Sequence, residues 1–121
     1  MAINVFKNVR ETIALEPEAV LFRQGDDGDV MYAILEGEIR VEHDGRVLET
    51  LGTGEILGEL ALIDRTPRTA SAVAHTPARV VRVDRDRFMF LVQEHPTFAL
   101  QVMAVMAERL RRANDQGAAA R

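Results

Sequence analysis

Short strand-like segments alternate with glycine-containing turns through the first two thirds of the chain, and this pattern constrains the fold most strongly. Three consecutive segments, 30–35, 38–43 and 46–51, are separated by Glu36-Gly37 and Asp44-Gly45. Asp-Gly between apolar runs is among the strongest signals for a β-hairpin. Because turns recur about every ten residues, the pattern predicts an all-β sandwich or a jelly-roll-like β-barrel.

One face of this sheet is expected to be exposed to water. In the second of these segments, Ile39 and Val41 point to one side and the charged residues beside them point to the other. Two later runs, 71–75 and 79–84, predict further strands. We therefore expect the barrel to span about residues 19–84.

Helical periodicity replaces the strand pattern after Asp84, which suits the N-cap of a helix over 85–94. Pro96 interrupts this helix because it lacks an N–H and disfavours helical backbone in the residue before it. A second helix is predicted over 97–113. Residues 114–121 are expected to form a frayed tail.

The first ten residues predict a short amphipathic helix, because Ile3, Phe6 and Val9 are spaced three apart. With 121 residues, 47% of them apolar and 28% charged, the chain is typical of one globular domain, which we place at 1–113. The predicted fold class is mostly β: a jelly-roll-like barrel with a short N-terminal helix and two closing C-terminal helices over 85–113.

Composition excludes several classes of function. There is no cysteine, which excludes a disulfide scaffold and thiolate metal sites. A net charge of −4 argues against a nucleic-acid partner, which normally requires a basic face. No apolar run approaches the ~20 residues needed to span a bilayer, and the N-terminus lacks the pattern of a signal peptide. We expect a cytoplasmic protein with no membrane partner.

The stretch 56–73 places an acid and an arginine in otherwise apolar surroundings. A small anionic ligand with hydroxyl groups needs such parts. The guanidinium of Arg68 can bind two oxygens at once, and Glu59 can accept a hydrogen bond from a hydroxyl. Gly58 lets the ligand approach the main chain, and the turn that follows offers free backbone N–H groups. Pro67 stiffens the loop just before the arginine.

Together, these segments resemble the cyclic nucleotide-binding domain family. That family includes the bacterial catabolite activator protein, the regulatory subunits of protein kinase A and cyclic nucleotide-gated channels. GELALIDRTPRTASAVA resembles its phosphate-binding cassette, and FRQGDDGDVMYAILEGEIRV resembles its early strands. DRDRFMFLVQEHPTFALQVMAVMAERLRR resembles its two closing helices, so the resemblance covers nearly the whole chain.

The resemblance implies a role for each residue of the site. Glu59 would bind the ribose 2′-hydroxyl, and Arg68 would pair with the cyclic phosphate. The other predicted ligand-binding residues are Gly58, Leu60, Ala61, Thr69 and Ala70 around sugar and phosphate, Val41, Leu48 and Leu51 near the base, and Arg109, Arg112, Ala113 or Asn114 over the base.

The function that the resemblance implies is a non-catalytic sensor of cyclic nucleotides, with cAMP as the expected ligand and no other cofactor. Ligand would draw the closing helices over the base, with the hinge near His95-Pro96. Thr69 favours cGMP in some relatives, whereas an arginine- and alanine-rich composition typical of bacteria tilts the expectation to cAMP. No helix-turn-helix, kinase-inhibiting segment or channel pore is recognisable after residue 113, so transcriptional or channel function is not expected unless this is a fragment of a longer protein. The expected partner is an effector protein that the sequence does not identify.

Other interpretations stay open beside this one. A protein-interaction module could keep the fold without the ligand, but it would be expected to lose Glu59 or Arg68, and neither is lost. A metal enzyme on a jelly-roll-like barrel would need clustered histidines, whereas those of this chain are isolated, so we expect no metal and no catalysis. The apolar stripe of the last helix suits either packing onto the barrel or a homodimer seam. That stripe consists of Phe98, Val102, Met106 and Leu110.

Overall fold

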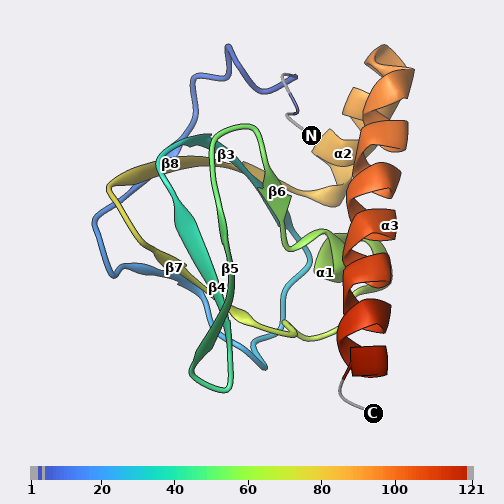
Figure 1. Cartoon of the computed structure of the whole chain (residues 1–121). Coiled ribbons are helices and arrows are strands. Elements are labelled where there is room, and N and C mark those ends of the chain that lie inside the picture. Colours follow the sequence, from blue (N-terminus) through green and yellow to red (C-terminus); the bar gives the residue numbers. More distant parts are fainter. Residues whose placement is uncertain (1–2, 4, 120–121) are drawn as a thin grey trace.

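The structure is a computed structural model that describes residue 3 and residues 5–119 (Figure 1). Eight strands form two antiparallel four-stranded sheets, which confirms the predicted mostly-β, jelly-roll-like fold as two sheets rather than one closed barrel. The first sheet has the order β1 (Ile13–Leu15), β8 (Ala78–Val83), β3 (Met31–Glu36), β6 (Ile56–Leu57). The second has the order β2 (Val20–Phe22), β7 (Ser71–Ala74), β4 (Ile39–His43), β5 (Arg46–Leu51).

The two predicted turns between the early strands have different roles. Asp44 (φ 51°) and Gly45 (φ 79°) both adopt left-handed backbone and join β4 to β5 as a hairpin. Gly37 instead carries the chain from one sheet to the other, because β3 pairs with β8 and β6 but not with β4. A Cβ at this glycine would lie 2.2 Å from the carbonyl oxygen of Pro77, so no larger residue fits there.

Two hydrophobic clusters hold the elements together. One lies between the two sheets and includes Ile34, Ile39 and Val80. The other lies between the first sheet and the C-terminal helices and includes Met31 and Phe98. The helices are therefore attached through their apolar core to the first sheet. The second sheet and α3 instead both contribute residues to a pocket.

The predicted N-terminal helix is wrong within the described residues, since residues 5–8 form turns. The apolar spacing still has its effect, because Ile3 and Phe6 are buried against the core and the Phe6 ring packs edge-on to Phe98. The Ile3 N–H donates to the Gly54 carbonyl (2.7 Å) rather than to a helical partner. The strands also begin earlier than residue 19, because β1 pairs with β8 along the edge of the first sheet.

Both C-terminal helices form as predicted, with one change of length. Asp84 caps α2 (Arg85–Glu94) by accepting from the Arg87 N–H at 2.8 Å. α3 (Pro96–Ala119) begins at the proline, which the first helical turn tolerates, and continues past residue 113. α3 therefore includes residues 114–119 of the expected tail; residues 120–121 lie outside the described part. None of the described helices is both long and apolar enough to cross a membrane.

Candidate ligand-binding site

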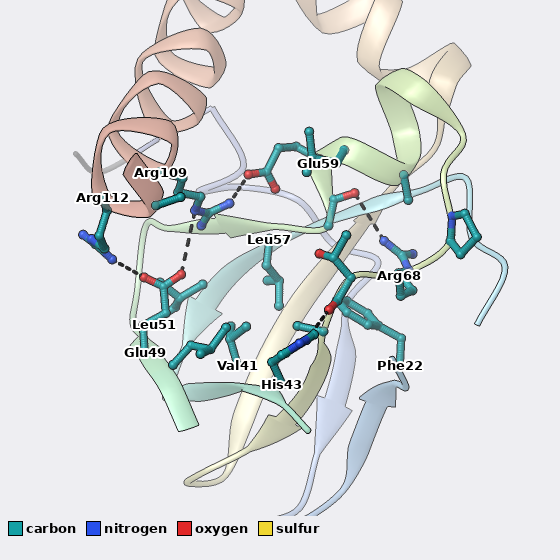
Figure 2. Close-up of a pocket in the computed structure, with 18 residues that line it drawn as sticks. Phe22, Val41, His43, Glu49, Leu51, Leu57, Glu59, Arg68, Arg109 and Arg112 are labelled. Carbon is teal, nitrogen blue, oxygen red and sulfur yellow. Dashed lines mark hydrogen bonds and ion pairs between the residues drawn. The ribbon is translucent and has the colours of Figure 1, made fainter. Parts of the chain in front are cut away.

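A pocket of about 460 Å³ lies between the second sheet, α3 and the short helix α1 (Glu59–Asp64) (Figure 2). It brings together residues from widely separated parts of the sequence, as the cassette assignment predicted. Asn114 is the exception: it is exposed and does not line the pocket. The predicted residues that line it are Val41, Leu48, Leu51, Gly58, Glu59, Leu60, Ala61, Arg68, Thr69, Ala70, Arg109, Arg112 and Ala113.

Gly58 starts α1 with a backbone that only glycine adopts readily. Its φ is 78°, in the left-handed region, and a Cβ there would lie 2.5 Å from the Arg68 Nη1 atom. The glycine thus lets the chain turn sharply from β6 into α1 while the arginine passes close to its backbone. The sharp turn and the close approach of Arg68 both occur at Gly58, so the start and the end of the cassette meet at this residue.

The Arg68 side chain is held in a buried slot. Only 6% of the residue is exposed, and its Cζ atom lies 4.2 Å from the centre of the Phe22 ring, within cation–π range. On another side it meets Gly28, where a Cβ would lie 2.5 Å from the Arg68 Nε atom. Gly28 therefore makes room for the guanidinium.

The hydrogen bonds of Arg68 are incomplete. Nη1 donates to the Gly58 carbonyl at 3.2 Å, whereas Nε is buried and has no hydrogen-bond partner among the described residues. Burial lowers the pKa of the Arg68 guanidinium below its ordinary value, but an arginine remains charged at neutral pH. A buried charge is costly unless it is paired, and an anion in the pocket that Arg68 lines would supply the opposite charge.

Main-chain hydrogen bonds fix the position of the arginine. The Arg68 N–H donates to the Asp26 carbonyl (2.8 Å), and the Gly25 N–H donates to the Arg68 carbonyl (2.8 Å). The loop after β2 therefore anchors the cassette at the residue that carries the charge. His43 adds a side-chain contact one residue further on, with its Nδ1 atom 3.0 Å from the Thr69 carbonyl oxygen.

Glu59 is buried as deeply as Arg68 but has a different partner. The residue is 3% exposed, and one of its carboxylate oxygens pairs with Arg109 of α3. Arg109 also donates through Nη2 to the Ile56 carbonyl at 2.6 Å. Figure 2 shows no contact for the second Glu59 oxygen among the residues drawn. That oxygen can accept a hydrogen bond from a hydroxyl group.

A second acid, Glu49, extends this pairing along α3. It pairs with Arg112, and its Oε1 atom lies 3.8 Å from the Arg109 Nε atom. These ion pairs attach α3 to both β5 and α1 at the side of the pocket (Figure 2).

Sequence reasoning did not assign five pocket residues to the ligand. Pro67 was assigned only a stiffening role, and the others come from β2 and β6 or from pocket-facing positions of β4 and β5. The alternation of β4 could have indicated His43, which follows Val41 by two residues on the same face. The five residues are Phe22, His43, Glu49, Leu57 and Pro67.

Comparison with known proteins agrees with this geometry. Residues 12–95 match the profile described as "Cyclic nucleotide-binding domain". Over 100 residues the chain is 36% identical to the CRP-like cAMP-activated global transcriptional regulator of Mycobacterium tuberculosis, covering 78% of this chain and 45% of that protein. The chain thus spans less than half the length of that relative.

Two further matches show how widely the domain is used. Over 106 residues the chain is 31% identical to the lysophospholipase nte1 of Neurospora crassa, covering 84% of this chain and 7% of that protein. The crystal structure of the Thermus thermophilus catabolite activator protein superposes with a TM-score of 0.79 and 29% identity, covering 92% of this chain and 60% of that one. From the matched profile, the fold and the arrangement of the cassette, this chain belongs to the cyclic nucleotide-binding domain family.

Proposed function

We propose that this domain is a non-catalytic sensor that binds cAMP in the pocket between the second sheet and α3. One observation carries the proposal: the buried guanidinium of Arg68 lines the same pocket as the buried carboxylate of Glu59. A cyclic nucleotide supplies an anionic phosphate for the first and a ribose hydroxyl for the second. Two of its chemical groups thus match two unusual features of one cavity.

The proposed binding mode follows from the hydrogen-bond donors and acceptors that these residues offer. The cyclic phosphate would accept hydrogen bonds from Arg68 and from backbone N–H groups at the start of α1. The ribose 2′-hydroxyl would donate to the Glu59 oxygen that Arg109 does not use. The purine would then lie on the apolar pocket wall made by Val41, Leu48 and Leu51.

Transmission to the rest of the molecule is proposed to pass through α3. A ligand shifts a conformational equilibrium only by the difference in its affinity for the two states. Glu59 joins the ribose site to Arg109, so hydroxyl binding and the position of α3 are linked through one carboxylate. We place the hinge at His95, the C-cap between α2 and α3, whose φ and ψ of −135° and 78° are not helical.

A homodimer is the proposed assembly, formed by the exposed apolar side of α3. Leu100, Met103 and Leu110 are more than half exposed, and Ala107 lies between the last two. The spacing of three, four and three residues is that of a coiled-coil seam, and a second copy of the helix offers the matching stripe. The signal would then pass to an effector.

cGMP is the second candidate ligand, because Thr69 lines the pocket and a threonine hydroxyl group can bind a guanine amino group. Titration calorimetry with cAMP and cGMP tests the proposal, with acyclic 5′-AMP as a control for unspecific binding. We expect saturable heat with at least one cyclic nucleotide. In Arg68→Ala, the loss of a charge-assisted contact should weaken binding by about 1.5–3 kcal/mol, or roughly 10- to 150-fold.

Arg65→Ala is the matched control, because that neighbouring arginine is exposed and lies outside the pocket lining. The proposal fails if neither cyclic nucleotide gives heat or displacement at millimolar concentration. Unchanged affinity in Arg68→Ala would show instead that the phosphate binds elsewhere.

A further inference from the structure

Glu49 is a carboxylate in a position where the fold does not require one. It lies on β5 opposite Val41 of β4, two residues before the buried Leu51, and all three line the pocket. Its side chain is 22% exposed. An acid placed beside apolar neighbours at a partly buried site needs compensation, and Arg112 supplies some of it.

A β-bulge directs this part of β5 into the pocket. Val41 pairs with Glu49 and Glu42 pairs with Val47, so Leu48 is an extra residue without a partner on β4. A bulge changes the direction of side chains locally, and bulges are frequent beside binding sites. Leu48 and Glu49 therefore both line the pocket, although consecutive residues of a regular strand would point to opposite faces.

The Glu49 carboxylate keeps unused capacity to accept hydrogen bonds. Arg112 donates to Oε2, and within the described part of the chain no hydrogen bond reaches Oε1. The Arg109 Nε atom is 3.8 Å from Oε1, which is an ion-pair distance but too long for a hydrogen bond. An ionised carboxylate offers about four lone-pair sites, so most of them remain open to a ligand.

We propose that Glu49 determines base specificity by accepting hydrogen bonds from the purine; this inference rests on the proposed function. With the phosphate at Arg68 and the ribose at Glu59, the base lies against the pocket wall that contains Glu49. Guanine presents two adjacent donors, N1–H and the 2-amino group, which match the two oxygens of a carboxylate. Adenine presents one amino group beside an acceptor nitrogen, which a carboxylate does not favour. Glu49 therefore raises the affinity for cGMP relative to cAMP, whichever of the two binds more tightly.

The test compares affinity ratios for cAMP, cGMP and cIMP, measured by calorimetry on the whole chain. The hypoxanthine base of cIMP keeps N1–H but lacks the amino group, so it reports one of the two hydrogen bonds. Glu49→Gln exchanges one acceptor oxygen for a donor. We expect it to weaken cGMP about 10-fold more than cAMP, with cIMP in between, since a good bidentate pair discriminates between bases by about this much.

Two further variants separate base recognition from support of α3. Glu108→Gln removes the other carboxylate that pairs with Arg112 (3.2 Å) but lies outside the lining of this pocket, so its ratios should equal those of the parent. Glu49→Asp keeps the charge and shortens the reach, and it should shift the ratios in the same direction as Glu49→Gln.

The outcomes distinguish this inference from the proposed function. An equal loss of affinity for all three nucleotides in the Glu49 variants would assign the residue to anchoring α3 and overturn the inference, with the proposed function intact. Unchanged affinities in both variants would also overturn it. If the parent chain binds none of the three nucleotides, the proposed function fails and the inference fails with it.

Discussion

Arg68 is restrained at the residue scale by a neighbour that has no side chain. Gly28 is not in the left-handed region of φ, so alanine could adopt its backbone, yet a Cβ would lie 2.5 Å from Arg68 Nε and 2.8 Å from Cζ. Glycine is therefore needed at this position to leave space for the guanidinium, and not to form a turn. In Gly28→Ala the flexible end of Arg68 must move.

We expect Gly28→Ala to weaken cyclic-nucleotide binding on the order of 10-fold, because the charge-assisted contact to phosphate loses its geometry. Stability should change little, since alanine restricts the unfolded chain and the clash involves only a side-chain end. Calorimetry and thermal unfolding measure the two effects. Gly52→Ala is the matched control, because its added Cβ would meet only Glu55 Oε2, at 4.0 Å. Parent-like affinity in Gly28→Ala would contradict the assignment of the phosphate to Arg68.

At the scale of elements, sequence patterns predicted the turns and helix caps that depend on neighbouring residues. The Asp44-Gly45 hairpin and the Asp84 cap depend on residues close in sequence, and both form as predicted. The short strands β1 and β6 carry little periodicity, and their pairing with β8 and β3 defines them. The bulge at Leu48 likewise depends on pairing with β4, so no sequence pattern could place the consecutive residues Leu48 and Glu49 on the same side of β5.

The same limit applies to the candidate site. The cassette residues Glu59 and Arg68 are nine positions apart on one continuous segment, and both line the pocket as predicted. The residues that surround them come from other elements: Phe22 from β2, Gly28 from the following loop and Arg109 from α3. These partners follow from the tertiary fold, which spacing alone does not determine.

Arg85 of α2 forms hydrogen bonds to α1, and its replacement is predicted to lower the stability of the domain. The Arg85 Nη2 atom donates to the carbonyls of Leu62 (2.9 Å) and Ile63 (3.3 Å), at the C-terminal end of α1. Cations stabilise such ends, so Arg85→Ala should lower the free energy of unfolding by about 1 kcal/mol. Thermal unfolding should show a decrease in Tm of roughly 4 °C.

Arg87→Ala on the same helix is the control, because the Arg87 side chain makes none of the hydrogen bonds or ion pairs found among the described residues. Its Tm should stay close to that of the parent. If Arg85→Ala unfolds at the parent temperature, the contact contributes nothing measurable, as many exposed pairs do.

At the scale of the whole molecule, α3 has two opposite sides with different roles. One side packs Phe98 and Val102 into the core and extends Arg109 and Arg112 to the pocket. The other exposes apolar residues, among them Leu110, which belongs to the predicted stripe and is 63% exposed. With ligand on the pocket side and a second copy of the chain on the exposed side, α3 would connect the ligand site directly to an assembly interface.

The last prediction concerns that assembly. If a second copy covers the seam, light scattering after gel filtration should give twice the monomer mass, with dissociation on dilution. The double variant Met103→Glu, Leu110→Glu places like charges along the stripe and should give a monomer, since the acids would be brought together across the seam. Met89→Glu with Phe90→Glu on α2 is the matched control, because those side chains are exposed to a similar extent but lie off the seam. A parent that is monomeric at all concentrations, with and without cyclic nucleotide, would contradict the homodimer. Dissociation by the α2 pair alone would place the interface on α2 instead.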